Sequence, residues 1–164
     1  MPRIFAIDPS IRACGWAKKD SKSNLIHAGL CRSNKKRTEF AIQEIFDKIE
    51  NYCPYDLDYL IIEKPIIQQN WTRNRIQDVS KLLMCYGSLL LLAMPDTKLI
   101  TPTVPEWKGQ LPKEVSHERM FKTADRHGFI INITDKNKTP KSLMHNVYDA
   151  IALLITYLEK ENLL

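Results

Sequence analysis

The first fifty residues alternate between short apolar runs and polar turns before a helical periodicity begins. The segment RIFAID, residues 3–8, predicts a buried central strand that ends at a Pro-Ser turn. CGWAKKD (14–20) and LIHAGLCRS (25–33) predict two further strands of a meander, joined by a polar turn. Apolar residues at helical spacing then predict a helix over 38–51, with Thr38 as its N-cap.

The remaining chain alternates predicted strands with predicted helices. Strands are expected over 56–63 and 98–101, and helices over 75–94, from Ser116 to about Gly128, and from Ser142 to about 160, with a polar loop over 134–141. The helix 75–94 is apolar around most of its circumference, so we expect it to be buried on two sides, by its own sheet and by a partner.

This order of elements predicts an α/β fold. A meander continued by strand–helix units gives a mixed five-stranded sheet with helices on both faces. A chain of 164 residues has the size of a single domain, which we assign to residues 1–164.

Composition narrows the class of protein only slightly. The longest apolar run, SLLLLAM, is far shorter than the roughly 20 residues that cross a bilayer, so no membrane segment is expected. With no recognisable leader, we expect a cytoplasmic protein, encoded by a cell or by a virus acting in its host. The four cysteines form no CxxC pair and are expected to be reduced thiols. The net charge of +5 suits a polyanionic partner without demanding one.

Three acidic residues stand where charged side chains are unusual. Asp8 and Glu63 each end a strongly apolar strand, and Asp149 lies within the apolar helix HNVYDAIALLI. Each has a simpler explanation on its own: Asp8 can open a turn, Glu63 can pair with Lys64 or Arg73, and Asp149 can interact favourably with the helix dipole. Two adjacent strands and one helix can also bring all three together, where they would repel one another without a cation. Oxygen ligands suit Mg²⁺ or Mn²⁺, and two such ions about 4 Å apart support phosphodiester hydrolysis.

These motifs resemble those of the RuvC-type Holliday junction resolvases of the RNase H-like superfamily, in order and almost from end to end. The matching segments are FAIDPSIRACGWA, LIIEKPIIQQN, TPTVPEWKGQLPKEVSHERM and HNVYDAIALLI. The resemblance implies an RNase H-like fold and a homodimeric endonuclease that resolves branched DNA by paired nicks. It also implies two metal ions, bridged by Asp8 and completed by Glu63 and Asp149.

Further site residues follow from the resemblance. Lys108 and Lys113 match lysines that hold the scissile phosphate or the DNA near the metals, and Asn70 lies at the expected distance beyond Glu63. Both lysines can alternatively belong to a solvated loop. The chain departs from the family three residues before its last acid, where Asn146 replaces Asp or His and His145 comes one place earlier. Either residue can complete the metal site, although Asn brings no charge.

Basic residues adjoin the acid-bearing elements and predict salt-dependent DNA binding. Arg73 and Arg75 lie in the segment after Glu63, and further lysines and arginines precede the first and last helices. Trp71 lies in the same polar loop and is a candidate to stack on unpaired bases, or else packs on the following helix.

Three further expectations concern partners and rival functions. The helix 75–94 is the candidate dimer contact, with complete burial inside one subunit as the alternative. An actin-like or sugar-kinase-like ATPase needs glycine-rich loops and a second lobe, which five glycines and 164 residues do not supply, so no nucleotide cofactor is expected. A branched-DNA-binding protein that has lost catalysis is the main alternative, because Asn146 departs from the family pattern.

Overall fold

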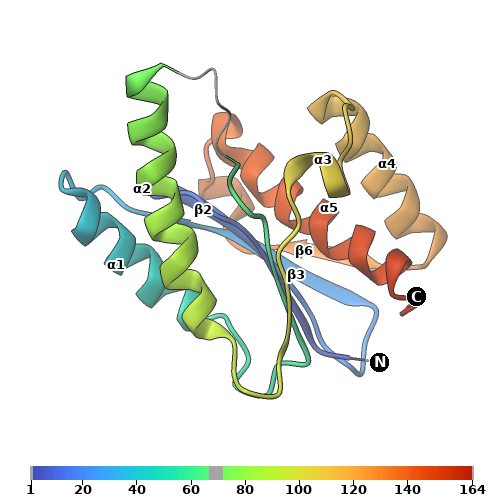
Figure 1. Cartoon of the computed structure of the whole chain (residues 1–164). Helices are drawn as coiled ribbons and strands as arrows, with labels where there is room; N and C mark the ends of the chain where they lie inside the picture. The colour runs from blue at the N-terminus through green and yellow to red at the C-terminus, as the bar shows by residue number, and fades with distance from the viewer. Residues whose placement is uncertain (1, 67–71, 164) are drawn as a thin grey trace.

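The computed structural model, which describes residues 2–66 and 72–163, is built around one mixed β-sheet (Figure 1). Its strands are β1 (Ile4–Asp8), β2 (Ala13–Lys19), β3 (Leu25–Arg32), β4 (Tyr59–Ile62), β5 (Lys98–Ile100) and β6 (Ile130–Ile133). Their order in the sheet is β5-β4-β1-β2-β3-β6. Strands β1, β2 and β3 form the antiparallel meander, whereas β4 runs parallel to β1, β5 parallel to β4, and β6 parallel to β3.

Helices cover both faces of this sheet. They are α1 (Thr38–Glu50), α2 (Arg73–Leu89), α3 (Val104–Trp107), α4 (Lys113–Arg126) and α5 (Met144–Lys160), with short 3₁₀ turns at Leu90–Leu92 (η1), Lys136–Lys138 (η2) and Lys141–Leu143 (η3). Figure 1 shows α1 and α2 on one face, and α5 on the other with α3 and α4 outside it. The α/β class and the helices on both faces are therefore confirmed.

The alternation of side chains along β1 explains the two cores. Ile4 and Ala6 point into the core under α5, whereas Phe5 and Ile7 point into the core under α1 and α2, and all four are almost fully buried. Because successive residues of a strand face opposite sides, a strand that is apolar at every position must lie in the middle of a covered sheet. Asp8 is the first residue of β1 at which this apolar pattern stops.

Helix α5 lies unusually close to the meander at Gly15 of β2. A Cβ atom placed on Gly15 would lie 2.0 Å from the backbone oxygen of Asn146, so only glycine fits there. The side-chain amide of Asn146 also donates a hydrogen bond of 2.6 Å to the backbone oxygen of Ala13. These two contacts fix the N-terminal part of α5, and with it Asp149, against the strand that follows Asp8.

Several predicted boundaries are wrong. The sheet has six strands rather than five, because Ile130–Ile133 pairs with β3 as a short edge strand; the sequence prediction left it out although three of its four residues are isoleucine. Ser116 does not cap a helix: α4 begins at Lys113, and Ser116 is buried within it. Arg37 rather than Thr38 is the N-cap of α1, and α5 begins at Met144 after η3 instead of at Ser142. Gly128 does take the left-handed conformation (φ +67°) expected just beyond a helix end.

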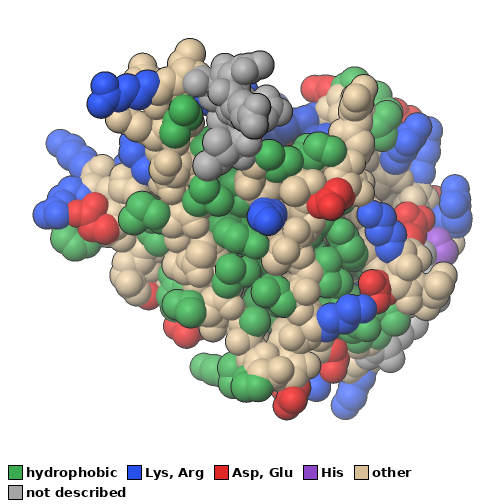
Figure 2. Space-filling model, viewed as in Figure 1, with side chains coloured by type: hydrophobic (Ala, Val, Ile, Leu, Met, Phe, Trp, Pro, Cys, Tyr) green, Lys and Arg blue, Asp and Glu red, His purple; other side chains and the backbone are tan. Residues whose placement is uncertain are grey.

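Helix α2 is also less buried than predicted. Only Cys85 and Leu89 of this helix are buried, on the side that packs against α1. Large apolar side chains are instead exposed on α2, on η1 and on the chain leading through β5: Ile76, Met84, Leu91, Met94 and Leu99. We call these five residues the α2–β5 surface. Figure 2 shows hydrophobic side chains gathered over this part of the molecule. No helix in the described part of the chain has both the length and the apolar character needed to cross a membrane.

Candidate active site

The three acidic residues singled out in the sequence line one cavity. Asp8 ends β1, and Glu63 follows β4, the parallel neighbour of β1, where its backbone N–H donates to the carbonyl of Ile7 at 3.1 Å. Parallel neighbours end at the same edge of a sheet, so these two carboxylates meet there. Asp149 reaches the same place from the second turn of α5. The cavity has a volume of about 180 Å³, and its wall also contains Lys108, Lys113 and Asn146.

Asp149 is surrounded by basic groups. Its Oδ2 accepts a hydrogen bond of 3.1 Å from Lys113 Nζ, while its Oδ1 lies 2.8 Å from His117 Nε2 and 3.5 Å from Lys108 Nζ. Burial alone would raise the pKa of Asp149, but the hydrogen bond from His117 and the charges of the two lysines outweigh burial and lower it. Asp149 is therefore held as a carboxylate.

Asp8 and Glu63 lie in the opposite electrostatic situation. Burial raises the pKa of Asp8 well above its ordinary value, and repulsion from Glu63 and Asp149 raises it further against the opposing lysines. Burial also raises the pKa of Glu63, although Trp107 Nε1 donates a hydrogen bond of 2.9 Å to Glu63 Oε2 and partly offsets the increase. Burial, with added repulsion between the acids, thus makes these two neighbouring carboxyl groups resist ionisation despite the two lysines in the cavity wall.

This donor set fits a divalent cation. Carboxylate oxygens are the ligands that Mg²⁺ and Mn²⁺ prefer, and a bound cation would offset both the burial and the repulsion among the three acids that raise the pKa values of Asp8 and Glu63. Within residues 2–66 and 72–163, no group of three or more His, Cys, Asp or Glu side chains is arranged closely enough to hold a metal ion. The fit therefore rests on the chemistry of these oxygens and on their shared cavity.

The other predicted site residues fall into three groups. Lys108, Lys113 and Asn146 line the cavity, whereas His145, one place before Asn146, is not part of its wall. Arg73 and Arg75 are exposed in the first turn of α2, away from the cavity wall. The predictions for Asn70 and Trp71 lie outside the described residues.

Sequence reasoning missed two residues of the site. Trp107, which hydrogen-bonds Glu63, comes from the short helix α3, and His117, which contacts Asp149, comes from α4. The signal for His117 was its spacing of four residues from Lys113, which places both side chains on one face of a helix. Trp107 gave no comparable signal, because a tryptophan beside a buried core is ordinarily a packing residue.

Comparisons with known proteins identify the fold. Neither a protein-family model nor a curated protein sequence matches the chain. The Thermus thermophilus RuvC in complex with Holliday junction substrate is similar in structure, with a TM-score of 0.61 and 11% identity over 99% of this chain and 96% of that chain. The Fowlpox virus resolvase in complex with its substrate Holliday junction DNA gives a TM-score of 0.55 and 19% identity over 97% and 98%. The yeast mitochondrial Holliday junction resolvase gives a TM-score of 0.57 and 10% identity over 97% of this chain and 81% of that chain.

These structures share the architecture of the chain over nearly its full length. The RNase H-like fold expected from the sequence is therefore confirmed, as is its resemblance in structure to RuvC and to viral and mitochondrial resolvases. At 19% identity or less, the likeness concerns the fold alone.

Proposed function

We propose that this protein is a divalent-metal-dependent endonuclease that resolves four-way junctions and related branched DNA by paired nicks in the cytoplasm of a cell or an infected host. The observation that carries the proposal is the convergence of Asp8, Glu63 and Asp149 with Lys108 and Lys113 in one cavity. The fold supports it, because two of the similar structures were solved with Holliday junction DNA.

The carboxylates of Asp8, Glu63 and Asp149 would hold two Mg²⁺ or Mn²⁺ ions. Such an ion pair activates a water molecule and stabilises the leaving oxygen of a phosphodiester. Of the two candidates one turn before Asp149, we favour Asn146 over His145 as an additional ligand, because Asn146 lines the cavity. Its amide nitrogen already donates to Ala13, which leaves the side-chain oxygen as the atom able to bind a cation.

The two lysines differ in what they can do. The Lys108 side chain is 7% exposed and is fixed beside Asp149, so it supplies a constant positive charge to the wall of the cavity. The Lys113 side chain is 52% exposed, so it can leave Asp149 Oδ2 and bind the scissile phosphate instead. His117 and Trp107 act as positioning residues. Each contacts one oxygen of a carboxylate and thereby orients the second oxygen of the same carboxylate.

The electrostatics favour an enzyme over a simple DNA-binding protein. Buried carboxylates beside one another destabilise a fold and repel DNA phosphates, so they are costly in a protein that only binds DNA. A cation between them reverses both effects. The observation that favours the alternative, a branched-DNA-binding protein without catalysis, is that both oxygens of Asp149 already have basic partners.

A homodimer would supply the two symmetry-related nicks that a four-way junction requires. We propose the α2–β5 surface as its contact, because large apolar side chains are exposed there beside β5, an edge strand of the sheet. Changing Met84 and Leu91 to Glu should convert the dimer to a monomer in light scattering. A wild-type protein that is already monomeric at micromolar concentration would contradict this contact.

The decisive experiment incubates a labelled four-way junction with the wild-type protein in Mg²⁺ and in Mn²⁺. Paired nicks that disappear in Asp8→Asn, while junction binding persists, would support the proposal. Retarded but intact DNA with either metal would favour the binding protein without catalysis. Cleavage by Asp8→Asn equal to that of the wild type would refute the assignment of the acids.

A further inference from the structure

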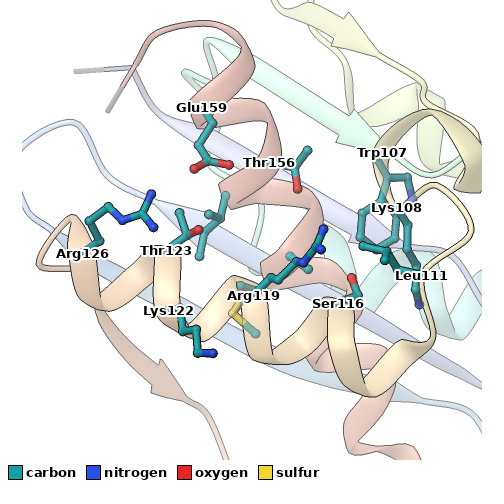
Figure 3. A pocket seen from close by; sticks show the side chains of 13 residues that line it. Trp107, Lys108, Leu111, Ser116, Arg119, Lys122, Thr123, Arg126, Thr156 and Glu159 are labelled. Atoms are coloured by element: carbon teal, nitrogen blue, oxygen red, sulfur yellow. The ribbon is translucent and has the colours of Figure 1, made fainter.

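A second and larger cavity lies beside the candidate active site, between α4 and α5. We call it the α4–α5 groove; it has a volume of about 400 Å³. Trp107 and Lys108 belong to the walls of both cavities, so the groove begins where the active site ends. Met120 and Ile155 contribute to an apolar floor, and Figure 3 shows polar side chains from both helices around it.

Three basic side chains follow the α4 wall of this groove. Arg119, Lys122 and Arg126 are spaced three and four residues apart, which places them along one side of the helix. Figure 3 shows Arg119 reaching across from α4 toward Thr156 of α5, and Arg126 at the end of the groove far from Lys108. From Arg119 to Arg126 the row covers seven helical steps, or about 10 Å of helix.

The charges in the groove are poorly balanced. Lys122 pairs with Glu118 at 2.7 Å, but within the described residues neither Arg119 nor Arg126 makes an ion pair. Glu159, on the α5 wall, is the one acidic residue among those that line the groove in the described part of the chain. Two arginines thus face a groove that offers them a single carboxylate.

The lining suits the phosphates of a DNA strand. Ser116 and Thr123 of α4 and Thr156 of α5 add hydroxyl groups, which donate to phosphate oxygens in protein–DNA complexes as Arg and Lys do. Phosphates recur at every nucleotide of a DNA strand, so a basic row of about 10 Å is long enough to contact more than one of them. A solvated helix face would explain the charges but not their position along a groove that opens beside the catalytic acids.

We infer that the α4–α5 groove is a second phosphate-binding site, which holds one strand of a DNA arm beyond the scissile bond through Arg119 and Arg126. The inference rests on the proposed nuclease function and adds to it the surface that a DNA arm follows away from the active site. It concerns affinity rather than chemistry, because neither arginine lines the cavity of the acids.

The test measures the affinity of a fluorescent four-way junction by anisotropy between 50 and 200 mM salt. Arg119→Ala/Arg126→Ala should bind at least about 10-fold more weakly at 100 mM salt, and the slope of log Kd against log salt should fall by about 2. Arg119→Lys/Arg126→Lys keeps both charges and should retain most of the affinity. Lys22→Ala, in the exposed turn between β2 and β3, is the control for loss of a remote charge.

A second measurement separates binding from catalysis. At saturating junction, the single-turnover cleavage rate of the double alanine variant should stay within about 3-fold of the wild type. If its affinity and salt slope match those of Lys22→Ala while the wild type binds and cleaves junctions, the groove inference is refuted and the nuclease proposal stands. A cleavage rate that falls with affinity unchanged also refutes it. A wild type that binds no DNA refutes both.

Discussion

The hydrogen bond between Trp107 and Glu63 offers a sharp test of how the site is tuned. Replacing Trp107 with Phe removes the donor at 2.9 Å from Glu63 Oε2 but keeps an aromatic ring at a position that is only 9% exposed. A hydrogen bond to a charged group contributes about 1.5–3 kcal/mol, and each 1.4 kcal/mol, roughly, is a factor of ten in affinity. The ionised form of Glu63 should lose that stabilisation.

The expected consequence is weaker metal binding with unchanged DNA binding. The hydrogen bond lowers the pKa of Glu63, so its removal raises that pKa further and leaves less carboxylate at a given pH. The Mg²⁺ concentration for half-maximal cleavage should rise about 10- to 100-fold, in the range usual for groups that orient metal ligands. The acid limb of the pH–rate profile should move to higher pH for the same reason.

Trp16→Phe is the matched control. Trp16 is 2% exposed on β2 and packs in the core under α1 and α2, where it stacks on Tyr52, so the same substitution removes volume without touching an acid. Both variants should lose stability in thermal unfolding, but only Trp107→Phe should change the Mg²⁺ dependence. A half-maximal Mg²⁺ concentration within a factor of two of the wild type in Trp107→Phe would refute the reasoning.

Three further predictions concern stability and positioning. Asp8→Asn should raise Tm in EDTA near pH 8, because burial raises the folded-state pKa of Asp8 above its ordinary 3.8 and the ionised form then destabilises the fold. The gain in Tm should vanish below about pH 3.8, where Asp8 is protonated in both the folded and the unfolded state. An equal gain at both pH values would contradict this prediction. His117→Ala should slow cleavage about 10- to 100-fold, because it removes the hydrogen bond to Asp149 Oδ1. His117→Gln should recover part of the lost rate, and equal cleavage rates in the two variants would exclude a hydrogen-bonding role for His117. Gly15→Ala should lower the free energy of unfolding by about 3 kcal/mol or more, because the added Cβ would clash with the Asn146 backbone. Gly87→Ala should raise the free energy of unfolding by about 0.5–1 kcal/mol, because the added Cβ meets open space and alanine favours the helix α2. Chemical unfolding measures both changes.

The sequence predicts the centre of the fold better than its edges. Strands β1 and β4 are buried on both faces, so every position is apolar and the pattern ends abruptly at Asp8 and Glu63. Strand β6 was missed even though three of its four residues are isoleucine, because a run of four residues is too short to show the period of a strand. It lies at the sheet edge, where Ile130 is two-thirds exposed. For helix α2, in contrast, the sequence predicted more burial than the structure shows. Its apolar residues suggested burial on two sides, but the structure buries one side of the helix and leaves the other exposed.

The same physical distinction separates the parts of the site that the sequence could predict from those it could not. A carboxylate at the end of an apolar strand can be recognised from the sequence, because a charged residue is unusual directly after a run of apolar residues. Trp107 and His117 agree with their local surroundings, and their importance arises only from contacts 44 and 32 residues away. Those contacts lower the pKa values of Glu63 and Asp149 against the burial that raises them. Ionisation in this cavity is therefore a property of the tertiary structure, and measurements of metal and pH dependence test the site more directly than the identities of its acids.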